Sequence, residues 1–158
     1  MSTKSIGLLA AGLLLSLGLA SKAQSDQGHD HGGGYGEPGV AAQVNRTIAL
    51  NASDDMRFSP GKIRVRQGET IRFVVSNVGK VRHEFSLGSR QDMLAHQEHM
   101  KMYPDMVHED ANRVTVEPGQ KGEVIWTFSK AGQFDFACLY PGHFEAGMHG
   151  RIQVAKSR

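Results

Sequence analysis

The sequence predicts an all-β fold, a sandwich of seven or eight short strands. From Val44 onward, short runs of β-branched and aromatic residues alternate with polar residues. This is the period of a strand that buries one face. Glycine, proline and asparagine separate the runs at short intervals, and strands spaced in this way favour an antiparallel sandwich.

The expected strands cover the chain almost to its end, with one interruption. Turn signals such as Asn77-Val-Gly79 and Pro118-Gly119 lie between them, because glycine and proline suit the backbone angles of tight turns. The expected strands are residues 44–50, 62–66, 70–76, 81–87, 113–117, 123–129, 133–138 and 151–155.

The first 23 residues have the pattern of a secretory signal peptide. Lys4 gives a positive start, Ile6–Leu19 is an apolar stretch, and a small-residue cleavage site ends at Ala23, as in exported proteins. The stretch is shorter than the roughly 20 residues of a membrane-spanning helix. We therefore expect an exported, soluble, periplasmic protein without a membrane span.

Residues 24–43 are rich in glycine and histidine and poor in apolar side chains. Such a segment buries too little surface to offset its ordering entropy, so we expect a flexible tail. His29 and His31 lie in this tail, and whether they bind a metal ion stays open. Residues 44–158 then form the one folded domain, with an insertion at about 89–112.

The overall charge excludes two classes of partner. Lys4 and Lys22 lie in the signal peptide, so its removal lowers Lys+Arg from 18 to 16, against 16 Asp+Glu. A balanced charge gives no indication of nucleic acid or of an anionic membrane surface as a partner. We expect a monomer whose partner is a protein.

Cys138 is the only cysteine of the chain. A single cysteine in an exported protein cannot form an internal disulfide. Three explanations are open: a buried inert thiol, an intermolecular disulfide, or a thiolate bound to a metal ion.

The residues around Cys138 favour the third explanation, a thiolate bound to a metal ion. Cys138, His143 and Met148 follow one another as Cys-x4-His-x4-Met, and His83 lies in an earlier predicted strand. Taken alone, His83 is an ordinary core histidine and Met148 a gap filler. Together, a thiolate, two imidazoles and a thioether are the donors of a mononuclear copper electron-transfer site.

With these residues the chain resembles the cupredoxins, whose members share an upstream histidine and a Cys-His-Met loop near the C-terminus. The resemblance implies a Greek-key β-sandwich and one type 1 copper ion. His83, Cys138 and His143 would be equatorial ligands and Met148 the axial ligand. The loop spacing resembles that of rusticyanin. The stretch His83-Glu-Phe85, the Met/His-rich insertion and the closing run 136–150 resemble more the periplasmic cupredoxins linked to copper tolerance in bacteria. Many cupredoxins have asparagine or serine after the first histidine, where this chain has Glu84.

The insertion at 89–112 lacks a strand period, and Gln91–Met102 suits a helix that ends before Pro104. One face of this helix would carry Met93, His96 and Met100. Either this face packs over the sandwich, or soft donors form a second, weaker copper site. The candidate ligands of that site are Met93, His96, His99, Met100 and Met102.

The cupredoxin resemblance, the Met/His insertion and the histidine-bearing tail together imply a periplasmic protein of copper tolerance that handles copper or transfers electrons. The alternative is a dedicated respiratory electron carrier resembling rusticyanin. A cuprous oxidase is a third reading, but the chain has only one His-x-His pair, His29-Asp-His31, so we expect no catalysis. Apolar neighbours of His143, namely Leu139, Tyr140 and Phe144, are predicted to form a contact patch for a redox or copper-handling partner.

Overall fold

The fold comes from a computed structural model that describes residues 34–103 and 110–157. The predicted signal peptide, the histidines His29 and His31, and Pro104 lie outside the described residues. Within the described residues, no helix is long and apolar enough to cross a membrane.

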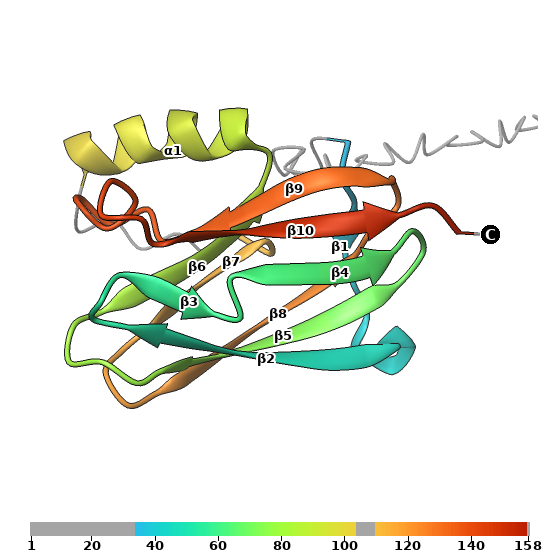
Figure 1. The fold of residues 1–158 in the computed structure, drawn as a ribbon, viewed down its shortest axis with the longest axis horizontal. Coiled ribbons are helices and arrows are strands. Elements are labelled where there is room, and N and C mark those ends of the chain that lie inside the picture. Colours follow the sequence, from blue (N-terminus) through green and yellow to red (C-terminus); the bar gives the residue numbers. More distant parts are fainter. Residues whose placement is uncertain (1–33, 104–109, 158) are drawn as a thin grey trace, which may run out of the picture.

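The described chain forms two five-stranded sheets packed face to face (Figure 1). The first sheet has the order β1-β8-β5-β2-β3. Its strands are β1 (Glu37–Pro38), β8 (Lys121–Thr127), β5 (Thr70–Asn77), β2 (Arg46–Ser53) and β3 (Arg57–Ser59).

The second sheet has the order β4-β10-β9-β6-β7. Its strands are β4 (Lys62–Arg66), β10 (His149–Ala155), β9 (Gly132–Ala137), β6 (His83–Gly88) and β7 (Arg113–Val116). Two helical segments complete the described chain, the short η1 (Ala41–Gln43) and α1 (Arg90–Met102). The predicted all-β sandwich with a partly helical insertion is confirmed.

The predicted antiparallel pairing is wrong for two strand pairs. β2 pairs with β5 in parallel, and β4 pairs with β10 in parallel. The chain leaves the first sheet after β3, forms β4 in the second sheet, and returns as β5. Such a crossover is what a parallel pair requires. The sequence pattern also missed β1 and β3, which have two and three residues.

The core fills the space between the two sheets. Alternate residues of β5 point into it, including Ile71, Phe73 and Val75, none of which is exposed. Phe85 and Phe136 from the second sheet lie with their ring centroids 5.4 Å apart, and Phe73 packs on Phe85 at the same distance. These aromatic contacts tie the two sheets together.

Strand β6 is buried along its whole length, on both faces. Its inner face contacts the core, and α1 contacts β6 and β9 from the outside (Figure 1). The helix begins at Ser89, whose side chain accepts a hydrogen bond from Asp92 N at 3.2 Å, as an N-cap does. The helix therefore shields from water the strand that begins with His83.

The helix turns a different face inward from the one expected. Its buried residues are Met93, Gln97 and Met100, whereas the sequence analysis expected Met93, His96 and Met100. Gln97 Nε2 donates to Glu145 Oε1 at 2.8 Å, so this polar side chain has a partner at the interface. His96 instead contacts the guanidinium of Arg113.

Part of the predicted flexible tail belongs to the fold. Tyr35 is 1% exposed and stacks on Trp126 with the ring centroids 5.2 Å apart. Its hydroxyl donates to Leu87 O at 3.1 Å, and Glu37–Pro38 pairs with β8. The expectation of flexibility is wrong for residues 34–43, because one aromatic ring finds a core position. Residues 24–33 lie outside the described residues.

The docking of Tyr35 gives a stability prediction. Replacing Tyr35 with alanine removes a buried ring, and we expect the free energy of unfolding to fall by about 3–5 kcal/mol. Tyr35→Phe keeps the ring and loses the hydroxyl contacts, at a cost of about 1 kcal/mol. Urea denaturation of the three proteins measures both values. Equal stability of Tyr35→Ala and wild type would contradict the docking.

Candidate metal centre

Two neighbouring strands bring a histidine and the cysteine together. His83 is the first residue of β6, and Cys138 directly follows the last residue of β9. Because β6 and β9 are paired and antiparallel, the start of one lies beside the end of the other. The three side chains His83, Cys138 and His143 place their ligand atoms within 4.8 Å of one another.

The third side chain comes from the loop between β9 and β10. Cys138 N donates to Met148 O at 3.0 Å, and Met148 N donates to His143 O at 3.0 Å. Gly142 and Gly147 have φ of +84° and +99°, angles that glycine adopts without strain. Arg57 of β3 donates from Nη1 to Ala146 O at 2.8 Å. The loop is therefore folded back on Cys138 and held by the opposite sheet.

The sulfur of Cys138 is enclosed and receives directed contacts. Glu84 N donates to Sγ at 3.3 Å, and His143 Nδ1 lies 3.3 Å from Sγ. Burial raises the pKa of the Cys138 thiol to about 12, and N–H groups of Glu84 and Tyr140 oppose this only in part. Without a metal ion the thiol keeps its proton, so metal binding must release it.

The two imidazoles differ in their access to water. His83 is fully buried, whereas His143 is partly exposed. Burial, with the nearby His83 as the second cause, lowers the pKa of His143. A neutral imidazole is the form that binds a metal ion. The environment therefore favours the metal-binding form of His143.

His83 uses one ring nitrogen for a contact that the sequence analysis missed. Its Nε2 lies 3.2 Å from Asp54 Oδ1, while its buried Nδ1 has no hydrogen-bond partner among the described residues. Asp54 is 29 residues upstream in a turn between β2 and β3. No spacing or periodicity in the sequence could have connected the two residues.

Met148 lies in the same buried cluster as Cys138 and is not exposed. Its backbone contacts both Cys138 and His143. The predicted role of Met148 as a ligand stays a prediction, and its place in the loop is compatible with it.

Only one of the residues predicted to form a contact patch around His143 is fully buried. Leu139 is 1% exposed and clusters with Met93 of α1 and Ala137, with Phe144 packed against them. Tyr140 is partly buried and packs against the main core. Leu139 is therefore not available for such a patch. Tyr140 and Phe144 are only partly buried, and the ring of Tyr140 lies 6.0 Å from that of His143, so their part in the patch stays a prediction.

The five candidate ligands of the insertion have different environments. Met93 and Met100 are buried, His96 contacts Arg113, and His99 lies with its ring 5.0 Å from that of Tyr103. Met102 is 66% exposed. The buried methionines fit the packing interpretation, and a second copper site there stays a prediction.

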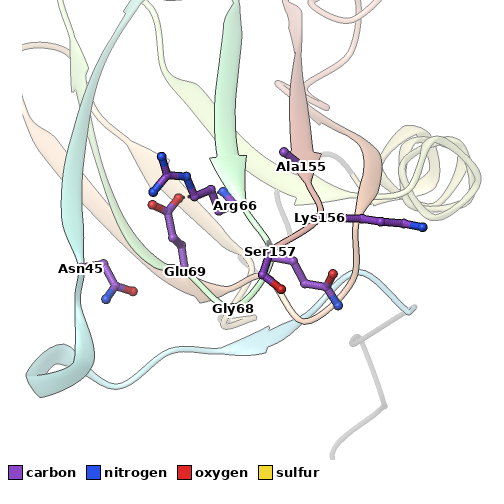
Figure 2. A pocket seen from close by; sticks show the side chains of 8 residues that line it. Asn45, Arg66, Gly68, Glu69, Ala155, Lys156 and Ser157 are labelled. Carbon is purple, nitrogen blue, oxygen red and sulfur yellow. Dashed lines mark hydrogen bonds between the residues drawn. The ribbon is translucent and has the colours of Figure 1, made fainter.

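A pocket lies near the C-terminus, and Figure 2 shows the side chains that line it. Its volume is about 800 Å³. It is lined by Arg66, Glu69 and Lys156 among other polar residues. Strand β10 begins at the loop of Met148 and ends at this pocket. The pocket therefore lies at the opposite end of the sandwich from the three clustered side chains.

Comparison with known proteins assigns the family. Residues 45–155 match the model of the copper binding proteins of the plastocyanin/azurin family. The chain belongs to this family, and the predicted resemblance to the cupredoxins is confirmed.

Two relatives and one solved structure are similar to the chain. It is 49% identical over 147 residues to the copper-resistant cuproprotein CopI of Rubrivivax gelatinosus, which covers 85% of this chain and 89% of that protein. It is 37% identical over 179 residues to CopI of Pseudomonas aeruginosa, with 93% and 96% covered. An auracyanin of Roseiflexus castenholzii has the same fold, with a TM-score of 0.60 and 21% identity over 71% of this chain and 98% of that chain.

The donor set fits copper. A thiol and two imidazoles are close together, and one nitrogen of the buried His83 has no partner among the described residues. A buried polar atom without a partner costs free energy, and a bound metal ion removes that cost. Thiolate and imidazole donors suit copper and disfavour magnesium or calcium.

Glu84 is a buried carboxyl group beside this site, and we expect it to make the stability of the folded protein depend on pH. Burial raises the pKa of Glu84 from 4.5 to about 7. Between these values the folded protein holds a proton that the unfolded chain has released. Stability therefore falls as pH rises from 4.5 to 7, by about 3 kcal/mol from this group.

Urea denaturation of the metal-free protein at pH 5 and pH 7.5 measures this effect. The side chain of Glu84→Gln cannot ionise. We therefore expect the free energy of unfolding of this variant to fall much less between the two pH values than that of wild type. Glu123→Gln on β8 removes an exposed carboxylate and serves as the control that keeps the wild-type behaviour. The same pH dependence in Glu84→Gln and in wild type would show that Glu84 is not its source.

Proposed function

We propose that this chain is an exported type 1 copper protein of the periplasm that acts in copper tolerance. His83, Cys138 and His143 are the equatorial ligands of one copper ion, and Met148 is the axial ligand. The observation that supports this most directly is the convergence of three ligand atoms within 4.8 Å. The order of the ligands along the chain and the membership in the copper binding family agree with it.

Bound copper supplies a one-electron redox couple, and the protein determines how that couple is used. His83, Cys138 and Met148 are fully buried, so water has no access to that side of the site. His143 is the partly exposed ligand, and its ring edge is the shortest route to a partner. Such an arrangement suits electron transfer or copper exchange with another periplasmic protein, to which the monomer binds transiently.

A role in copper tolerance is favoured over a purely respiratory role by the relatives. Both similar proteins are named copper-resistant cuproproteins, and one of them is 49% identical over most of both chains. The alternative, a respiratory carrier resembling rusticyanin, shares the ligand order but lacks this support.

We further propose that the chain is not an enzyme. The buried ligands leave no side of the site open to a substrate, apart from the edge of His143. A cuprous oxidase would accept electrons from cuprous ion at that edge. Sustained oxidation of added cuprous ion under air, many turnovers per bound copper, would favour that alternative.

The copper spectrum tests the ligand assignment. We expect the protein loaded with cupric ion to show the intense visible absorption of a copper thiolate, and Cys138→Ser to lose it. Met148→Leu keeps the thiolate, so its absorption persists while the reduction potential changes, because the axial ligand tunes that potential. A colourless wild-type protein in cupric salt would refute the assignment.

Growth on rising copper separates tolerance from respiration. We expect a deletion strain to stop growing at a lower copper concentration than the parent, and the wild-type gene to restore growth while Cys138→Ser does not. Respiratory growth at low copper is the control. A respiratory defect with unchanged copper tolerance would favour the carrier instead.

A further inference from the structure

The two nitrogens of His83 have different environments. Nδ1 is buried without a partner among the described residues, and Nε2 lies 3.2 Å from Asp54 Oδ1. A carboxylate only accepts hydrogen bonds, and a neutral imidazole carries one N–H. The proton of neutral His83 therefore belongs on Nε2, where it is donated to Asp54. This leaves the lone pair of Nδ1 available.

The carboxylate of Asp54 is itself held in place. Lys80 N donates to Oδ2 at 2.7 Å and Val81 N to Oδ1 at 3.4 Å. Two backbone N–H groups therefore hold both carboxyl oxygens of Asp54 in place. Its side chain is 38% exposed, whereas that of His83 is 0% exposed, so the contact joins a solvated charge to a buried ring.

Gly79 provides the space that this arrangement needs. A Cβ atom added to Gly79 would overlap the carboxylate of Asp54, with Oδ1 as the nearest atom. The φ of Gly79 is not in the left-handed region, so glycine is required here for room. Asn77 fixes the same turn, because its side chain accepts from Gly79 N at 2.9 Å and donates to Val81 O at 2.7 Å.

We propose that Asp54 is a positioning residue of the copper centre, which fixes the ring of His83 with its proton on Nε2 and its Nδ1 lone pair toward the metal. This inference rests on the proposed function in one respect, namely that His83 binds copper. A carboxylate on the far nitrogen makes a ligating imidazole a stronger donor. A stronger donor favours the cupric over the cuprous ion and lowers the reduction potential.

Three variants separate this role from simple loss of charge or structure. Asp54→Asn keeps a group of the same size and removes the charge. Gly79→Ala keeps the charge and displaces the carboxylate from His83. Asp55→Asn, the control, removes the neighbouring exposed carboxylate, which accepts a hydrogen bond from Ser53 Oγ and does not contact His83.

The first measurement is made on the metal-free protein. Long-range ¹H–¹⁵N NMR spectra of the His83 ring report which nitrogen carries the proton. We expect the Nε2–H form in wild type and in Asp55→Asn, and a mixture of both forms in Asp54→Asn and Gly79→Ala. The Nδ1–H form in wild type would overturn the proposal, even if no variant folds.

The second measurement is made on the copper-loaded protein. Removing such an outer contact weakens metal affinity by about 10–100-fold. We expect Asp54→Asn and Gly79→Ala to bind the cupric ion more weakly by this factor. A loss confined to the cupric state raises the potential by about 59 mV for each factor of ten. Asp55→Asn stays close to wild type. Equal shifts in Asp54→Asn and Asp55→Asn would overturn the proposal, because they would indicate a general charge effect.

The two measurements distinguish failure of this inference from failure of the proposed function. If wild-type protein lacks the copper thiolate absorption, the proposed function fails, whatever the NMR spectra show. The other case is that this absorption is present, and that wild type and Asp54→Asn have the same His83 tautomer and the same copper reduction potential. The copper site then stands, and the role of Asp54 is refuted.

Discussion

The hydrogen bond from Glu84 N to Cys138 Sγ joins the two strands on which the site depends. It links the residue after His83 to the cysteine at 3.3 Å, across the boundary between β6 and the end of β9. The sulfur therefore has a defined position before any metal ion arrives. The loop that follows is anchored to the same residue by the backbone hydrogen bond from Cys138 N to Met148 O, and Met148 N in turn binds His143 O.

Burial gives the site both its rigidity and its unusual acid–base properties. Helix α1 covers β6 from outside, and the main core covers it from inside. The same enclosure holds the Cys138 thiol in its protonated form and raises the pKa of Glu84. The charge of Arg113 is the largest opposing influence on the pKa of Glu84, and Arg113 is itself paired with Asp110 at 3.0 Å. A carboxyl group and a thiol thus share a dry environment, in which the charge of Glu84 adds to the effect of burial on the pKa of Cys138.

The sequence predicted the parts of this fold that depend on local pattern. Alternation located the eight longer strands, and the residue types Cys138, His143 and His83 identified three side chains that the fold brings together. The features that the sequence did not predict depend on contacts between residues that are far apart in the chain. The parallel pairing of β2 with β5 follows from a crossover, and the inward face of α1 includes Gln97, whose partner Glu145 is 48 residues away in the chain. Tyr35 has no periodic neighbours, and its place follows from contacts with distant residues, such as its stack on Trp126 and its hydrogen bond to Leu87 O.

The loop from Cys138 to Met148 begins and ends on one backbone hydrogen bond between adjacent strands. Its two ends therefore stay fixed whatever lies between them, as in a β-hairpin whose turn varies in length. Residues inserted or deleted inside this loop change the position of His143 without moving His83 or the sulfur. Sequence changes confined to this one loop can accordingly alter the arrangement of such a centre while the sandwich stays the same.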